Sequence, residues 1–210
     1  RSITPVIDVL NGVRIRCLKE DSKGNLWICT SRAGVYKLTT DGGVKKYDKS
    51  NGLNGELYRT VTELSDNTIL VAGDSGMSFI KDDDSVYNIG TQMINSKVLC
   101  TLQADDKTIF AGTDGNGIEV IRDGVIVGNF GKNEGLSSGV ILRMVEDSSG
   151  DGIFIVTSNS ICYMDKTQNI RVLKNFPYYN NYDIVNGKDG MLFVLSSAGI
   201  FVVDEKKLLS

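Results

Sequence analysis

Apolar residues in this chain come in short runs, separated by polar segments that are rich in glycine. The clearest run is Leu26-Trp27-Ile28, and similar triplets are centred on Leu70, Phe110, Phe154 and Phe193, at steps of 39 to 44 residues. Runs this short, bounded by turn-forming residues, predict β-strands. Several short strands in a unit of about 40 residues predict a blade of a β-propeller.

The first repeat contains four predicted strands, at residues 13–19, 26–30, 35–38 and 44–47. The second strand is almost wholly apolar, and the fourth is the most polar. Antiparallel strands whose composition becomes progressively more polar are typical of a blade that runs from a central channel outward. We therefore expect the large central side chains to pack between blades; they are Trp27, Phe110, Phe154 and Phe193.

The repeats predict one all-β domain over residues 1–210, a β-propeller of four-stranded antiparallel blades with five repeats. The repeats cover approximately residues 13–53, 54–95, 96–138, 139–180 and 181–210. The last repeat lacks a fourth strand, and residues 1–12 contain an outer strand at residues 4–9 without inner strands of its own. That strand either completes the fifth blade and closes the ring or belongs to an earlier blade.

Composition limits the function more than it limits the fold. The chain has 23 Lys and Arg against 26 Asp and Glu, a net charge of −3, and no histidine. Without a basic surface, nucleic acid is not an expected partner. Without histidine, a Ser-His-Asp triad and a His-ligated metal are excluded, and we expect no cofactor. No apolar run approaches the roughly 20 residues of a membrane span, so this segment is not expected to insert into a membrane.

The four cysteines have no metal-binding spacing. Cys17 and Cys100 occupy the same position in the first and third repeats, which are not neighbours, so a disulfide between them is not expected. We expect most of the four to behave as buried thiols.

One string imitates a catalytic motif. Residues 73–76 read Gly-Asp-Ser-Gly, as around the nucleophile of serine proteases, but no histidine is present to act as the base. The string coincides with the predicted turn after the second strand of the second repeat. It is therefore interpreted as a turn, and the chain is not expected to be an enzyme.

Repeat alignment predicts a ligand site at one rim of the propeller. The residues eleven positions before the central apolar residue are Arg16, Arg59, Leu99 and Tyr182 in four of the repeats. The fourth repeat has one extra residue in its hairpin, which places Leu142 at the equivalent position, followed by Arg143. The turns between second and third strands lie on the same face, and their polar residues include Arg32, Asp114 and Asn116. Such a rim is rich in hydrogen-bond donors and suits a polar ligand. The alternative is an ordinary solvated rim.

The linker before the fifth repeat is a second candidate. It carries Tyr178, Tyr179, Asn180 and Tyr182. Aromatic faces beside amide groups suit sugar rings, which combine apolar C–H patches with hydroxyls. The alternative is a loop whose tyrosines pack on the rim.

Residues 20–30 resemble the repeat of the two-component regulator propeller family. The matching residues are Ile15, Arg16, Leu18, Glu20, Asp21, Gly24, Leu26, Trp27, Ile28 and Thr30, while Cys29 replaces a usual glycine. Residues 51–53 and 133–137 resemble the spacer that precedes each blade of that family. Members usually have seven or more blades in a ring, so the resemblance implies that five repeats are part of a larger, seven-bladed propeller and of a longer protein.

The resemblance implies an extracytoplasmic sensor, periplasmic or at the cell surface, tethered to the membrane in a bacterial signal-transduction protein of the histidine kinase or diguanylate cyclase type. It also implies an oligosaccharide or another small ligand as partner. The alternative is a scaffold for protein–protein interaction or dimerisation, with self-association and no small ligand. A propeller enzyme similar to streptogramin lyases would need a catalytic histidine, which this chain lacks.

Overall fold

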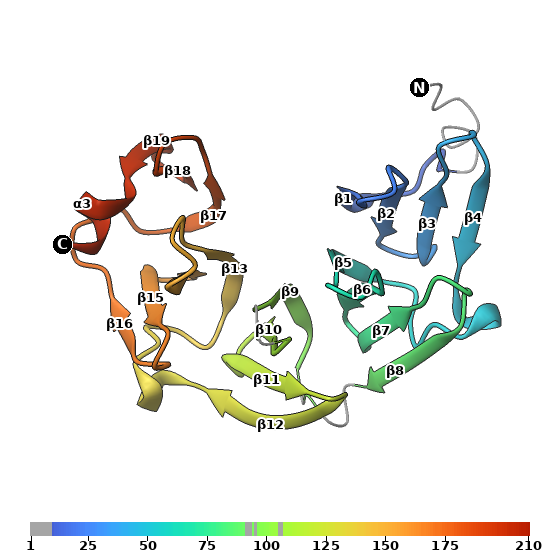
Figure 1. Cartoon of the computed structure of the whole chain (residues 1–210), viewed down its shortest axis with the longest axis horizontal. Helices are drawn as coiled ribbons and strands as arrows, with labels where there is room; N and C mark the ends of the chain where they lie inside the picture. Colours follow the sequence, from blue (N-terminus) through green and yellow to red (C-terminus); the bar gives the residue numbers. More distant parts are fainter. Residues whose placement is uncertain (1–9, 91–93, 95, 105–106) are drawn as a thin grey trace. The chain divides into compact units, whose positions relative to one another are not determined.

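A computed structural model describes residues 10–90, 94, 96–104 and 107–210. Its strands form five antiparallel sheets in which the order of strands follows the chain (Figure 1). The prediction of an all-β propeller fold built from blades is confirmed. The chain divides into two compact parts, residues 1–103 and 104–210, which are described separately.

The first part contains two complete sheets. The first sheet consists of β1 (Ile15–Glu20), β2 (Leu26–Thr30), β3 (Val35–Leu38) and β4 (Val44–Tyr47). The second consists of β5 (Tyr58–Glu63), β6 (Ile69–Gly73), β7 (Gly76–Ile80) and β8 (Val86–Gly90). β9 (Val98–Gln103) ends this part and is the first strand of the third sheet.

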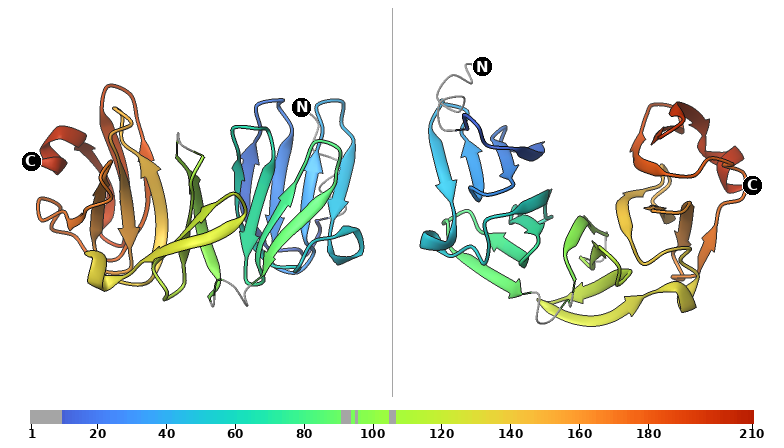
Figure 2. Two further views of the ribbon diagram at one scale, coloured as in Figure 1. Left: turned by 60° about the horizontal axis from the view of Figure 1, so that its bottom comes forward. Right: turned by 180° about the vertical axis from the view of Figure 1, so that it is seen from behind.

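The second part begins with the other strands of the third sheet, β10 (Ile109–Thr113), β11 (Ile118–Arg122) and β12 (Val125–Phe130). The fourth sheet consists of β13 (Ile141–Glu146), β14 (Gly152–Thr157), β15 (Ile161–Asp165) and β16 (Ile170–Val172). The fifth sheet has three strands, β17 (Asn181–Asn186), β18 (Met191–Ser196) and β19 (Gly199–Asp204), followed by the short helix α3 (Glu205–Leu209). Figure 2 shows these strands from two further sides.

The strand predictions for the first repeat agree closely with the structure. β2, β3 and β4 have the predicted bounds, while the first strand begins at Ile15 and not at residue 13. Each short apolar run is bounded by residues that favour turns, which is why sequence alone locates it. The predicted outer strand at residues 4–9 lies outside the described residues.

Large central side chains form the packing between neighbouring sheets. Trp27 is 2% exposed and lies in a cluster with Tyr47 from its own sheet and with Val61 and Val71 from the second. Its ring stacks on that of Tyr47 at a centroid distance of 5.5 Å. In the second part, Phe154 is 0% exposed and shares a cluster with residues of β17 and β18.

Phe193 departs from the expectation that all central residues are buried, because it is 44% exposed. Its strand alternates, so that Leu192 and Val194 face the fourth sheet and are buried while Phe193 and Leu195 face away. Among residues 107–210, that outer face of the fifth sheet packs against no other blade. The face also carries the exposed side chains of Val185 and Val202.

The four cysteines are free thiols. Cys29, Cys100 and Cys162 are buried and Cys17 is partly buried, as expected. Burial raises the pKa of the Cys29 thiol, with the neighbouring Cys17 adding to the effect, so Cys29 remains protonated and unreactive.

Asp21, at the start of the first hairpin turn, is a buried hydrogen-bond acceptor that stabilises its blade. Asp21 is buried, and its carboxylate accepts hydrogen bonds from the backbone N–H of Asn25 at 2.7 Å and from the indole Nε1 of Trp27 at 2.8 Å. In the fourth sheet the carboxylate of Asp147 makes equivalent contacts, because it accepts hydrogen bonds from the Asp151 N–H at 2.9 Å and from the Tyr163 hydroxyl at 2.5 Å. Each aspartate therefore joins the turn of its hairpin to a buried aromatic side chain. That side chain is Trp27 of the second strand in the first sheet and Tyr163 of the third strand in the fourth sheet.

Glycine recurs after the second strand because a side chain at that position would clash with the backbone of the fourth strand. Gly117 has φ +75°, and a Cβ built on it would lie 2.0 Å from the carbonyl oxygen of Phe130. In the first and third sheets this turn closes with a threonine hydroxyl that donates to the carbonyl four residues later. In the fourth sheet the hydroxyl of Thr157 donates to the carbonyl of Ser160, only three residues later. Ser160 does not adopt a positive φ, so a side chain is tolerated at this position of the fourth sheet.

Candidate functional site

A β-bulge interrupts the first strand of the first, second, fourth and fifth sheets. In each strand one residue is left out of the pairing with the second strand; these residues are Arg16, Arg59, Leu142 and Tyr182. They are the residues that the repeat alignment places at one position. A bulge redirects its side chain away from the regular pleat. The backbone thus presents these side chains at the edge of the sheet, beside the turn between the second and third strands.

In the first part, two of these bulged residues are arginines with different partners. Nε of Arg16 donates to the hydroxyl of Ser31 at 2.9 Å, and Nε of Arg59 donates to the carboxylate of Asp74 at 2.7 Å. Both partners lie 15 residues after their arginine, on the turn between the second and third strands. The geometry is therefore repeated, but among the described residues Arg59 has a carboxylate partner at this position and Arg16 has a hydroxyl.

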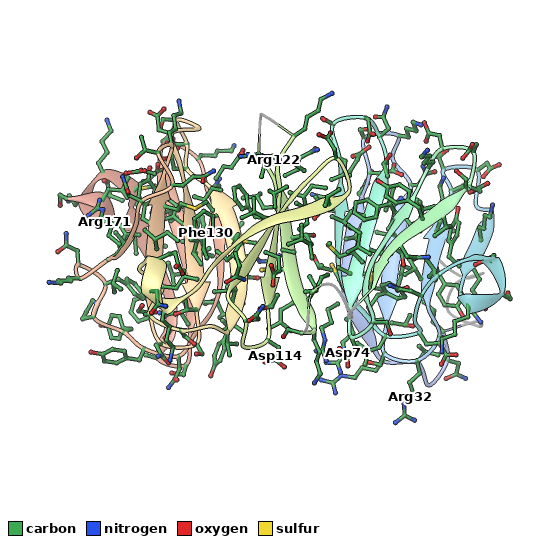
Figure 3. The ribbon with its side chains drawn as sticks, turned by 90° about the horizontal axis from the view of Figure 1, so that it is seen from below. Arg32, Asp74, Asp114, Arg122, Phe130 and Arg171 are labelled. Carbon is green, nitrogen blue, oxygen red and sulfur yellow. The ribbon has the colours of Figure 1, made fainter. Side chains whose placement is uncertain are left out.

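A hollow of about 420 Å³ lies beside Arg16. Arg14, Ser31, Arg32 and Leu57 contribute to its lining, together with Gly12 and Val13. Figure 3 shows Arg32 and Asp74 at the same edge of this part, with Arg32 extended away from the ribbon. Partial burial lowers the pKa of Arg16, the charges of Arg14 and Arg59 lower it further, and Asp74 opposes them. The edge therefore concentrates positive charge.

In the second part, the predicted residues Arg143, Asp114 and Asn116 are held by protein contacts. Arg143 follows the bulge and donates from Nε and Nη2 to the carboxylate of Asp183, at 2.5 and 2.9 Å. The amide of Asn116 donates to the carboxylate of Glu119 at 2.6 Å, and Asp114 forms a backbone bridge with Val140. These residues reinforce the edge of the sheet.

The tyrosines at the linker before β17 have different environments: Tyr178 packs on other rings, and Tyr179 and Tyr182 are mainly exposed. The ring of Tyr178 stacks on Phe201 at a centroid distance of 4.1 Å and also contacts Phe176. Tyr179 is 72% exposed and Tyr182, the bulged residue, is 53% exposed. Asn180 lies between them with φ +55°, and its carbonyl accepts from the N–H of Ser197. The linker therefore offers two exposed rings on a backbone that is fixed to the next turn.

Asn181 is a functional candidate that sequence reasoning missed. Its side chain is fully buried, its amide nitrogen donates to the carbonyl of Tyr178 at 3.0 Å, and the described residues offer its Oδ1 no donor. A buried acceptor of this kind is normally satisfied by water or by a bound group. The sequence alone does not distinguish Asn180 from Asn181, because the bulge at Tyr182 decides which amide turns inward.

The second part has a hollow of about 200 Å³ whose lining contains none of the predicted site residues. Phe110, Glu146, Gly150 and Lys166 contribute to its lining. It lies by the hairpins between first and second strands, whereas Asp114 lies at the opposite edge. Figure 3 shows Arg122 and Asp114 at these two edges of the third sheet.

Comparison with known protein families gives a match within the first repeat. Residues 9–32, which contain all of β1 and β2 together with Arg16 and Asp21, match the model described as two component regulator propeller. The first two strands of the first blade thus match this family's repeat. The motif residues of that repeat now have structural roles, because Asp21 and Trp27 form the buried hairpin contact and Arg16 is the bulged residue.

Solved structures share the fold of this repeat array at low sequence identity. Two are extracellular domains of proteins from B. thetaiotaomicron assigned as hybrid two component systems, with TM-scores of 0.74 and 0.77 and identities of 19% and 16%. They cover 91% and 92% of this chain, which spans only 27% and 30% of their length. A third is virginiamycin B lyase from Staphylococcus aureus, with a TM-score of 0.70 and 14% identity over 91% of this chain and 70% of the lyase.

Comparison with curated protein sequences gives no match. Among the described residues, no helix combines the length and apolar character needed to cross a membrane.

Proposed function

We propose that this chain is the ligand-sensing part of an extracytoplasmic β-propeller in a bacterial signal-transduction protein, and that the ligand is an oligosaccharide. The observation that carries the proposal is the two component regulator propeller repeat in the first blade. The fold shared with extracellular domains of assigned two component systems supports it. In the parent protein the propeller is tethered to a membrane, and its output is a histidine kinase or a diguanylate cyclase.

The proposed role is recognition without catalysis. The solved lyase structures include a variant described as catalytically inactive, in which a histidine is replaced by alanine. The present chain contains no histidine, so it cannot supply an equivalent group.

The linker before β17 is the proposed sugar site. Tyr179 and Tyr182 supply exposed aromatic faces, and Asn180, which lies between them in the sequence, supplies an exposed amide. The buried Oδ1 of Asn181 supports the proposal, because a water that links it to a sugar hydroxyl would satisfy the acceptor. Sugar rings bind in this way through C–H contacts with the ring face and hydrogen bonds at the margin.

The proposal predicts that a neutral oligosaccharide stabilises the chain on heating. A ligand that binds the native state alone raises the unfolding temperature in proportion to the logarithm of its concentration. Tyr179→Ala should weaken this binding by roughly three- to tenfold, because stacking on a ring is worth about 0.5–1.5 kcal/mol. Thermal unfolding in the presence of a library of neutral oligosaccharides is the measurement.

Tyr87→Ala is the matched control, because Tyr87 is an exposed tyrosine in the other part of the chain. It should leave the ligand-induced shift unchanged. A library without any active member contradicts the proposal, and a shift that Tyr179→Ala preserves contradicts the placement of the site.

The alternative function, an interaction scaffold, is favoured by one observation. The outer face of the fifth sheet exposes Phe193, Leu195 and Val202, and exposed apolar patches are typical of protein contacts. Self-association that depends on concentration, measured by sedimentation and abolished by Phe193→Ser, would favour this function if no sugar binds.

A further inference from the structure

We propose that the hollow lined by Arg14, Arg16 and Arg32 binds an oxyanion, either the carboxylate or the sulfate group of a small organic ligand. The inference goes beyond the proposed sugar site, because it concerns the other part of the chain and stands whether or not Tyr179 binds a neutral sugar. Four features carry it: a difference between two repeats, the form of the hollow, its charge, and the geometry of guanidinium groups.

The first feature is the difference between the first and second blades. Arg16 and Arg59 are both bulged residues, and each donates from Nε to the residue 15 positions later. In the second blade that residue is Asp74, and an ion pair forms at 2.7 Å. In the first blade it is Ser31, whose hydroxyl orients the guanidinium without neutralising it. The first blade therefore retains the geometry of the pair and lacks its negative charge.

The second feature is the hollow itself. Its volume of about 420 Å³ is within the range of small-ligand sites. The N–H of Ser31 donates to the carbonyl of Arg14 at 3.0 Å, which joins two of its walls. The bond from Arg16 to Ser31 fixes a third group in the same hollow. The hollow is therefore held by backbone and side-chain contacts.

The third feature is an excess of positive charge. Arg14 and Arg32 form no ion pair among the described residues, and both line the hollow. The nearby carboxylate of Asp74 is held by Arg59. On the far side of Arg32, Asp48 is paired with Lys46 at 2.9 Å, and Glu56 and Lys49 line the same adjoining surface. Partial burial lowers the pKa of Arg16, and the like charges of Arg14 and Arg59 lower it further.

The fourth feature is the chemistry of the guanidinium group. Its N–H donors form a planar fork that matches two oxygens of a carboxylate or sulfate, and it stays protonated at all physiological pH values. With Nε of Arg16 engaged by Ser31, its remaining N–H groups and those of Arg14 and Arg32 are donors for the ligand. A neutral sugar offers no negative charge to this set, so the hollow should discriminate in favour of acidic ligands.

The test follows the Nε–Hε signals of arginine in the ¹⁵N-labelled chain by NMR. The chain is titrated at constant ionic strength with sodium glucuronate, sodium sulfate and glucose. We expect a saturable shift of the Arg16 signal with glucuronate or sulfate and none with glucose. A response to glucuronate alone identifies a carboxylate ligand, and a response to sulfate alone identifies a sulfate ester. No saturable shift with either anion overturns the proposal.

Two reciprocal substitutions make the test specific. Ser31→Asp introduces the partner that the second blade has, and it should weaken anion binding about tenfold or more because Arg16 becomes neutralised. Asp74→Ser removes the carboxylate that is paired with Arg59, so the positive charge near the hollow increases. It should strengthen anion binding roughly two- to fivefold, which corresponds to the free energy of a partly exposed ion pair. If Ser31→Asp does not fold, Arg16→Gln replaces it, with the same loss expected.

Arg122→Gln is the control, because Nε of Arg122 also donates to a hydroxyl, that of Thr108 at 2.8 Å, in the other part of the chain. It should leave the affinity unchanged. Binding that survives Ser31→Asp, or that Arg122→Gln weakens equally, would contradict this site. Neutral oligosaccharides that depend on Tyr179 should bind Ser31→Asp normally, which separates failure of this inference from failure of the sugar site.

Discussion

Replacing Phe154 by alanine should lower the free energy of unfolding by about 3–5 kcal/mol, whereas Phe193→Ala should cost roughly 1 kcal/mol or less. The two residues occupy the same position in successive repeats, so their chemistry and local backbone are matched. Phe154 is 0% exposed between the fourth and fifth sheets, and its removal leaves a cavity. Phe193 is 44% exposed and leaves none. Urea unfolding followed by circular dichroism measures both.

Equal costs for the two substitutions would contradict the structure, since they would require the outer face of the fifth sheet to be covered. Cys162→Ala, a small change at a buried site of the fourth sheet, gives the cost of a minor core truncation for comparison.

Asp21→Ala should be the second most destabilising change, at about 2–4 kcal/mol. The substitution leaves the buried indole N–H of Trp27 and the N–H of Asn25 without their acceptor. Trp27 is the single tryptophan of the chain, so its fluorescence during urea unfolding reports directly on this blade. Asp83→Ala is the control: the carboxylate of Asp83 also caps a turn, accepting from Ser85, but it is exposed and should cost less than about 1 kcal/mol.

The same contact predicts how stability depends on pH. Burial opposes ionisation of Asp21, but the hydrogen bonds from Asn25 and Trp27 outweigh it and hold the pKa of Asp21 below its ordinary value. A carboxyl whose pKa is depressed by folding stabilises the fold above its unfolded pKa, about 3.9, and the contribution is lost as the pH falls through the folded pKa. The pKa of Asp147 is lowered in the same way.

We therefore expect the free energy of unfolding to fall on acidification below about pH 4. Asp21→Asn should be less stable than the original chain at neutral pH and should show a smaller loss on acidification. Urea titrations at several pH values measure this, and parallel pH profiles for the two proteins would exclude Asp21 as a source of the effect.

The sequence predicted the strands well because each blade repeats a local signal. The apolar run at Leu26–Thr30 is bounded by turn residues, and the structure places β2 at those residues. It did not predict the exposure of Phe193, since the periodicity of a strand is the same whether or not another sheet covers it. It also did not reveal that Asp21 is buried, because an aspartate in a hairpin sequence is normally read as exposed.

The candidate site could be predicted only in part. Aligning the repeats assigns Arg16, Arg59 and Tyr182 to the same position of their blades. The structure gives the physical reason, because each of these residues forms the bulge of its first strand. The same alignment shows that Ser31 in the first repeat corresponds to Asp74 in the second. That these residues are the hydrogen-bond partners of Arg16 and Arg59 follows only from the distances in the structure. Arg143 lies one residue beyond the bulge, which brings it to Asp183.

The central claim is that ligands bind at the edge of the blades that carries the bulged residues. The most direct measurement is a ¹⁵N NMR titration of the chain with an active oligosaccharide, in which each perturbed backbone amide is assigned. The account predicts perturbations at Tyr179, Asn180 and Tyr182 that saturate together. Saturable perturbations confined to Glu146, Gly150 and Lys166, in the hollow at the opposite edge, would contradict it.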